Sequence, residues 1–286
     1  MSVITSIIQA ILQSIAWIFP ISESGHSAIF HDFAGRADGS VAALTGIIHI
    51  GIALGIVASC FKVYKMLGVE FVTSGIDIVK RNFSVKRAKP PRQFMFYTLI
   101  TYAFMLLWLI PLGDAGFLYN VLRSSGFNKT LFEDGIFIAV TGAITFLCAR
   151  QLSLSRNDKQ MSLLPAVVCG ISSLVLVPVS GFSFTGGILA ILIFMSVKKS
   201  IAFKYTFALC APVLLVMGII EICVAAVPVS AVQIILGLIF SVAASFICVR
   251  TLKWVINKGY LKYVSYYTAA LGIIITVVGI VQLIVR

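Results

Sequence analysis

The chain has 286 residues, of which 60% are hydrophobic and only 11% are charged, and its mean hydropathy is +1.06. A soluble domain does not need so much apolar surface, so the composition excludes a soluble globular protein and predicts an integral membrane protein. The net charge of +12 is explained by cytoplasmic loops that face anionic lipids, so we expect no nucleic-acid partner.

The chain opens with a broken apolar stretch, residues 1–36. Gln9, Gln13 and Pro20 interrupt it, and it contains the polar cluster FPISESGH at 19–26. A removable signal peptide would have a basic start and an unbroken apolar run, and this stretch has neither. Backbone freed at such a break cannot face lipid, so we expect the cluster to be buried in protein or to line a wet cavity.

Six unbroken apolar runs follow, and crossing a hydrocarbon core takes about 20 helical residues. In chain order they are 42–61, 94–113, 135–149 with its flanking residues, 205–225, 229–249 and 264–285. Between the third and the fourth lies a second broken stretch, 163–197, with Pro, Ser and Gly in its middle. The sequence therefore predicts six transmembrane helices and two interrupted apolar segments.

The basic residues predict the orientation of the spans. Cytoplasmic loops carry an excess of lysine and arginine, so the basic loop after the first span is assigned to the inside. Threading alternately from there places 18 of the 22 lysines and arginines inside. This holds only if neither broken stretch crosses, so 1–36 is expected to dip in from the outside and 163–197 from the inside.

The residues assigned to the inside are Lys62, Lys65, Lys80, Arg81, Lys86, Arg87, Lys89, Arg92, Arg150, Arg156, Lys159, Lys198, Lys199, Lys204, Arg250, Lys253, Lys258 and Lys262. Those assigned to the outside are Arg36, Arg123, Lys129 and Arg286.

An internal repeat is visible, because FPIS at 19–22 recurs as VPVS at 177–180. Each is followed by a Gly/Ser-rich turn, a short apolar helix and three spans, and an odd number of spans turns the second half upside down. Pro-Ser breaks could recur by chance, but the charge distribution independently favours the repeat. We predict an all-α integral membrane protein with six transmembrane helices and two re-entrant helical hairpins in an inverted-topology repeat, 1–149 and 150–286. In transporters of this kind the binding site lies at the helix breaks.

QSIAWIFPISESGH at 13–26 resembles the first signature of the undecaprenyl-diphosphatase (bacitracin-resistance) family, Glu/Gln-Gly-x-x-Glu-x-x-Pro-x-Ser-Ser-Ser/Thr-Gly-His. SGFSFTGG at 180–187 resembles a degraded form of the second, Pro-Gly-x-Ser-Arg-Ser-Gly-x-Thr, and the resemblance extends to CAP at 210–212. It implies a cell-membrane protein that cleaves a phosphate from the polyprenyl diphosphate lipid that carries peptidoglycan precursors. It also implies a divalent cation, magnesium or calcium.

The match to the first motif is partial. Gln13 stands at its first Glu/Gln position, but Trp17 stands where the family has its second acidic residue. Glu23 replaces the middle serine, which the resemblance implies is used in catalysis. The matching positions are Pro20, Ser22, Ser24, Gly25 and His26.

The second motif departs further. Phe184 replaces the arginine, Ser180 the proline and Ile188 the final threonine, while Thr185 conservatively replaces a serine. The matching positions are Gly181, Ser183 and Gly186.

The resemblance implies a catalytic set of Ser22, Glu23, Ser24 and His26. It implies a substrate-binding set of Gln13, Gly25, Gly181, Ser183, Thr185 and Gly186. His49, in the first span, is a candidate for this set or for packing. No set of metal ligands is assigned.

Two functions stay open. Glu23 could attack phosphorus as a carboxylate, but Phe184 cannot grip phosphate as an arginine does, and Trp17 leaves a cation fewer oxygen ligands. The first hypothesis is a polyprenyl-diphosphate phosphatase with altered roles. The second is a non-hydrolytic, flippase-like binder or transporter of polyprenyl phosphate, in which a desolvated Glu23 shares a proton with His26. A homodimer is also left open.

Overall fold

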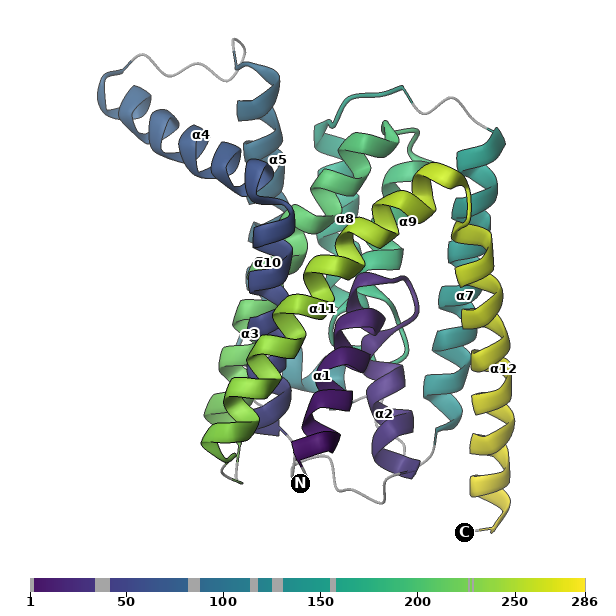
Figure 1. The fold of residues 1–286 in the computed structure, drawn as a ribbon. Coiled ribbons are helices and arrows are strands. Elements are labelled where there is room, and N and C mark those ends of the chain that lie inside the picture. Colours follow the sequence, from purple (N-terminus) through teal and green to yellow (C-terminus); the bar gives the residue numbers. More distant parts are fainter. Residues whose placement is uncertain are drawn as a thin grey trace.

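The computed structural model describes residues 3–33, 42–81, 88–113, 118–124, 131–154, 158–225, 227 and 229–285. These residues form helices and no β-sheet (Figure 1). Five helices are long and apolar enough to cross a membrane: α3 (Ala42–Ser59), α7 (Phe132–Leu154), α10 (Lys199–Val224), α11 (Ala231–Lys258) and α12 (Leu261–Val285). The prediction of a helical, multi-pass membrane protein is confirmed.

The predicted span 94–113 is divided in the structure. It contains most of α5 (Pro90–Met105) and a 3₁₀ turn, η2 (Leu106–Leu109), which the short helix α6 (Leu118–Ser124) follows. Two prolines can start α5 because its first backbone N–H groups need no partner within the helix. With 16 residues, α5 is shorter than a typical crossing, so it does not belong with the five long helices.

The basic segment expected as a loop after the first span is largely a helix, α4 (Phe61–Val79). In Figure 1 it leans away from the bundle, and its Phe71 and Val72 are each 60% exposed. Arg92 at the start of α5 holds it from one side, with contacts of 3.2 Å to Glu70 and 2.6 Å to Asp77. The sequence analysis did not anticipate this helix.

Two helical hairpins enter the bundle from opposite ends (Figure 1). One consists of α1 (Val3–Ile18) and α2 (Glu23–Phe33), and the other of α8 (Leu163–Leu176) and α9 (Phe184–Phe194). Each hairpin starts and finishes at the same end, and their turns lie close together in the middle. The breaks that the sequence analysis noted at FPIS and VPVS are the two turns.

The described basic residues that were assigned to the inside gather at one end of the bundle. That end holds α4, the starts of α5, α10 and α12, and the ends of α7 and α11 (Figure 1). Residues Arg36, Lys86, Arg87, Lys129, Arg156 and Arg286 lie outside the described residues, as does the side chain of Arg123.

Helices α7 and α12 pack with their backbones in contact. A Cβ atom added at Gly142 would lie 2.4 Å from the Ala269 backbone nitrogen, and one added at Gly272 would lie 2.2 Å from that of Ala139. Small residues allow such close approach between membrane helices, where dispersion replaces the hydrophobic effect as the driving force. The glycines along this contact are Gly135, Gly142, Gly272 and Gly279.

The contact predicts a large asymmetry between two glycine substitutions. Gly142→Leu should destabilise the protein by about 1–3 kcal/mol or more, because the side chain has no space, and should lower the melting temperature in detergent. Gly75→Leu on α4 is the matched control, since an added Cβ there meets nothing within 4 Å. A Gly142→Leu protein that melts with the wild type would refute the close approach.

Candidate functional site

The turn of the first hairpin is made at Ser22. Its φ of 70° is in the left-handed region, and its Oγ accepts a 3.1 Å hydrogen bond from the Gly25 backbone nitrogen, which caps α2. Ser22, and not Gly25, therefore makes the tight turn. Gly25 lies in the first turn of α2, where an added Cβ would be 2.6 Å from Ile138.

The two hairpin turns touch each other. The backbone nitrogen of Gly181, with φ of 87°, donates a 3.1 Å hydrogen bond to Ser24 Oγ. Gly186 packs closely against Pro20: a Cβ atom added at Gly186 would lie 2.7 Å from the Cβ atom of Pro20. Ser183 caps α9 by accepting from the Gly186 nitrogen at 3.1 Å. We call this contact region the hairpin junction.

Two threonines satisfy the backbone that the breaks set free. Thr185 Oγ1 donates to the carbonyl oxygen of Trp17 at 2.7 Å. Thr141, on α7, donates to the Gly181 carbonyl at 3.2 Å and accepts from the Ser183 nitrogen at 3.3 Å. The predicted residues Gly181, Ser183 and Thr185 therefore hold the junction together.

A buried histidine lies between two buried carboxylates beside the junction. His49 Nδ1 is 2.7 Å from Glu221 Oε2, and His49 Nε2 is 3.8 Å from Glu23 Oε1. The three residues come from α3, α10 and α2 and are 1%, 7% and 8% exposed. Ionisable groups at this depth are costly unless they are paired, so His49 and Glu221 form the pair and Glu23 lies a short movement away.

The polar contacts continue from Glu23 to the first helix. Ser27 Oγ donates to Glu23 Oε1 at 2.8 Å, and Gln13 Nε2 donates to Ser27 Oγ at 3.1 Å. We call Gln13, Ser27, Glu23, His49 and Glu221 the polar line. It joins α1, α2, α3 and α10, and it includes Gln13 and His49 from the predicted binding set.

His26 does not form the expected pair with Glu23. Its Nδ1 is 2.7 Å from the Ser22 carbonyl oxygen and its Nε2 is 2.9 Å from the Tyr267 hydroxyl of α12. A carbonyl can only accept, so Nδ1 carries the proton and, in the neutral ring, Nε2 accepts from tyrosine. Both ring nitrogens are occupied, and the imidazole that approaches Glu23 is that of His49.

Glu221 is the functional candidate that the sequence analysis missed. It is the one acidic residue within the apolar run 205–225. A carboxylate at membrane depth is a functional candidate by default, and that rule, applied to Glu23, would have selected Glu221 as well. Ser27 and Tyr267 carried no comparable signal.

The cavity at the junction is small and lacks a cation. Its volume is about 30 Å³, and its lining includes Glu23, Ser24 and Ser183 but no lysine or arginine. A water needs roughly 10–15 Å³ by this kind of measure, so the cavity has room for very few waters and none for a diphosphate.

Two aromatic rings close this cavity. Trp17 and Phe184 have ring centroids 6.1 Å apart and are 7% and 4% exposed. By the motif resemblance they occupy the positions of the second acidic residue and of the arginine. The two positions face each other, so a pair of charges is replaced by a pair of rings.

The described side chains do not fit a magnesium or calcium ion at the junction. Both ions take about six or more oxygen ligands, and Glu23 is the only carboxylate that lines the cavity. Within the described part of the chain no group of three His, Cys, Asp or Glu residues could hold a metal ion. The divalent cation stays a prediction from the family resemblance.

Comparison with known proteins identifies similar chains over nearly the whole length. The family model described as bacitracin resistance protein BacA matches residues 6–274. A protein of Methanosphaera stadtmanae named undecaprenyl-diphosphatase is 28% identical over 98% of this chain and 99% of its own. A protein of the same name from Alkaliphilus metalliredigens is 27% identical over 96% and 98%.

The buried pair predicts different costs for two substitutions of Glu221. Glu221→Leu should destabilise the protein by about 3–5 kcal/mol, because it leaves His49 buried without its partner. Glu221→Gln keeps an oxygen that can accept from Nδ1 and should cost less. Thermal unfolding in detergent measures both, and equal melting temperatures for Glu221→Leu and the wild type would show that the pair does not form.

Proposed function

The chain belongs to the family of bacitracin resistance protein BacA, and from this membership we propose that it acts on a polyprenyl phosphate or diphosphate carrier lipid. It is a multi-pass protein of the cell membrane. Similar proteins bear the name undecaprenyl-diphosphatase, so an undecaprenyl lipid is the proposed ligand. Recycling of the carrier for cell-wall synthesis is the proposed role.

The proposed architecture has six crossings, with α5 and η2 as the sixth, and two re-entrant hairpins in inverted halves 1–149 and 150–286. The pairing of helices supports it. Helix α3 packs on α10 and α7 on α12, which are the corresponding spans of the two halves. The contact of α1 with α11 has its counterpart in that of α8 with α5.

The observation that carries the proposal is the meeting of two helix N-termini at the hairpin junction. Helix α2 starts at Glu23 and α9 at Phe184, on either side of the hydrogen bond from Gly181 to Ser24. The positive ends of the two helix dipoles favour an anion there. We therefore propose that the lipid phosphate binds at the junction, beside the polar line.

Hydrolysis at this junction would proceed through Glu23. Its carboxylate oxygen would attack the terminal phosphorus, the bond to the bridging oxygen would break, and polyprenyl phosphate would leave. Water would then hydrolyse the acyl phosphate to release inorganic phosphate. Without the motif arginine, charge on the transferred group would be stabilised only by backbone donors, serine hydroxyls and the helix dipoles, and a comparable arginine is worth on the order of 10³ in rate.

The ring pair and the cation-free cavity favour a second candidate, a non-hydrolytic binder or transporter of the same lipid. In this function the headgroup enters when Trp17 and Phe184 separate. Glu23 then takes up a proton, which removes its negative charge and with it the repulsion of the anionic headgroup. His49, paired with Glu221, is the group placed to supply it, in the role that the sequence analysis gave to His26.

Phosphate release from undecaprenyl diphosphate separates the two candidates. Purified protein is assayed with and without magnesium or calcium, and binding of the lipid is measured in parallel. Release that Glu23→Gln abolishes supports the phosphatase, and binding with release no faster than buffer supports the binder. A protein that neither binds nor cleaves the lipid would overturn the proposed function.

Phe184→Arg alone is expected not to raise phosphate release. The new cation would be buried beside Trp17 without a partner, so this variant should also melt below the wild type. Because the two positions face each other, Trp17→Glu added to Phe184→Arg should recover part of the lost stability. Additive losses in the double variant would show that the side chains do not pair.

Glu23→Gln should flatten the pH dependence of polyprenyl phosphate binding between about pH 5 and 8. In the wild type, affinity falls as pH rises, because a charged Glu23 repels the headgroup. Titration of the lipid phosphate is common to both proteins and cancels in the ratio of their affinities. Glu70→Gln, at a half-buried carboxylate on α4 that pairs with Arg92 outside the junction, is the control and should keep the wild-type profile. An unchanged ratio across this range would exclude Glu23 from proton exchange.

A further inference from the structure

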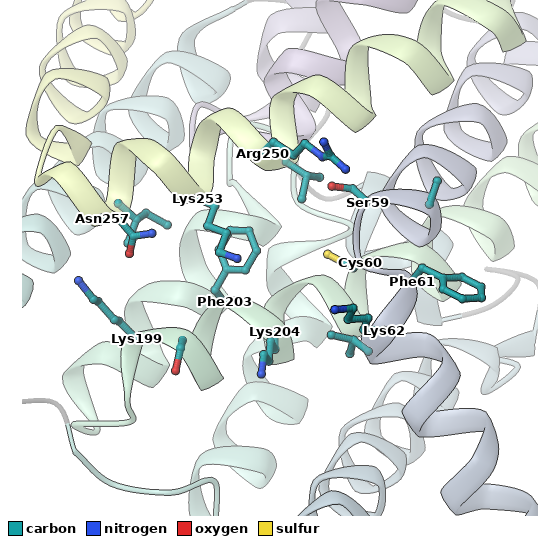
Figure 2. A pocket seen from close by; sticks show the side chains of 15 residues that line it. Ser59, Cys60, Phe61, Lys62, Lys199, Phe203, Lys204, Arg250, Lys253 and Asn257 are labelled. Carbon is teal, nitrogen blue, oxygen red and sulfur yellow. The ribbon is translucent and has the colours of Figure 1, made fainter.

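A second and larger pocket lies at the end of the bundle where the basic residues gather. Its volume is about 750 Å³, and it opens between the start of α4, the start of α10 and the end of α11. Figure 2 shows the side chains that line it. Among the described residues, no aspartate or glutamate lines the pocket, and the cations that do are Lys62, Lys199, Lys204, Arg250 and Lys253.

The described residues do not neutralise these five cations. Among the described residues none of them has a carboxylate within 4 Å; the ion pairs are made by His49 and Arg92 instead. Arg250 rests one face on the ring of Phe246, at 4.2 Å, which leaves its N–H groups available. Five like charges around one cavity repel each other, so a bound anion would lower the free energy of the folded protein.

Two helix N-termini also face the pocket. Helix α4 starts at Phe61 after Cys60, and α10 starts at Lys199 after Lys198, and neither capping residue accepts a hydrogen bond with its side chain. First-turn residues of both helices line the pocket. The N–H groups at these ends add donors and positive dipole to the charge of the lysines.

The remaining lining and the surroundings indicate a ligand with an apolar part. Phe203, Val249 and Ile256 form part of the wall. Exposed Trp254, 52%, and Tyr263, 59%, lie near the same end of α11 and α12. Aromatic residues gather where a membrane protein meets the headgroup layer, so the pocket lies at the depth of lipid phosphates.

We propose that this basic pocket binds the phosphate headgroup of a lipid from the adjacent leaflet. By the predicted orientation this is the cytoplasmic leaflet, whose anionic lipids bind basic pockets between transmembrane helices. The pocket shares no residue with the junction cavity, so the inference does not rest on the proposed function. The apolar wall distinguishes a lipid phosphate from a free phosphate ion.

The test compares phosphatidylglycerol with phosphatidylcholine of the same acyl chains, with binding to purified protein followed by native mass spectrometry. The wild type should retain phosphatidylglycerol preferentially. Lys204→Gln/Lys253→Gln should weaken its binding about tenfold or more, since each surface cation contributes on the order of 1 kcal/mol. Lys65→Gln/Lys80→Gln is the matched control, because it removes the same charge from exposed positions on α4 and directly after it, outside the pocket.

Three results would overturn the proposal: no preference between the two lipids, equal losses in the pocket and control variants, or displacement of the lipid by millimolar inorganic phosphate. Displacement by polyprenyl phosphate would support it and would identify the carrier lipid as the preferred occupant. Neither double variant should melt below the wild type, because each removes only exposed cations. Retention of phosphatidylglycerol is measured without polyprenyl phosphate, so a failure here is distinct from a failure of the proposed function.

Discussion

The arrangement of this protein depends on one constraint: backbone groups released by a helix break inside a membrane must find partners within the protein. The two hairpin turns meet that need largely between themselves. Gly181 donates to Ser24, and Thr185 donates to the carbonyl of Trp17. Because each turn satisfies a backbone group of the other, the two turns lie face to face, and this contact positions the starts of α2 and α9.

Buried charged groups are also placed beside partners within the protein. Where the resembling family has an acidic residue and an arginine, this chain places Trp17 against Phe184, and the buried residues Glu23, His49 and Glu221 lie together on the polar line. His49 takes Glu221 as a close partner and leaves Glu23 at 3.8 Å. The positive charge that the junction lacks lies instead at the start of α10 and the end of α11, around the basic pocket. The buried ionisable residues of the polar line and the exposed cations of the basic pocket are thus separated along the bundle.

Apolar runs and Pro-Ser breaks were enough to predict five of the six expected spans as long helices and the two helix breaks, because run length and broken periodicity are local properties. The position of His49 beside Glu23 was not predictable in this way. Glu221 lies on another helix, and only the packing of α3 against α10 brings His49 between the two carboxylates. Ser22 was missed as the turn residue because a non-glycine residue with positive φ has no reliable sequence signal. Helix α4 was read as a loop because its lysines were used as evidence of topology alone.

The closed ring pair has a kinetic consequence. If the headgroup can enter only after Trp17 and Phe184 separate, the protein must open before it binds, and the apparent affinity equals the affinity of the open form reduced by the fraction of molecules that are open. The observed association rate would then level off at high lipid concentration, at the rate of opening. Smaller side chains at these two positions would raise that plateau without adding any contact to the lipid.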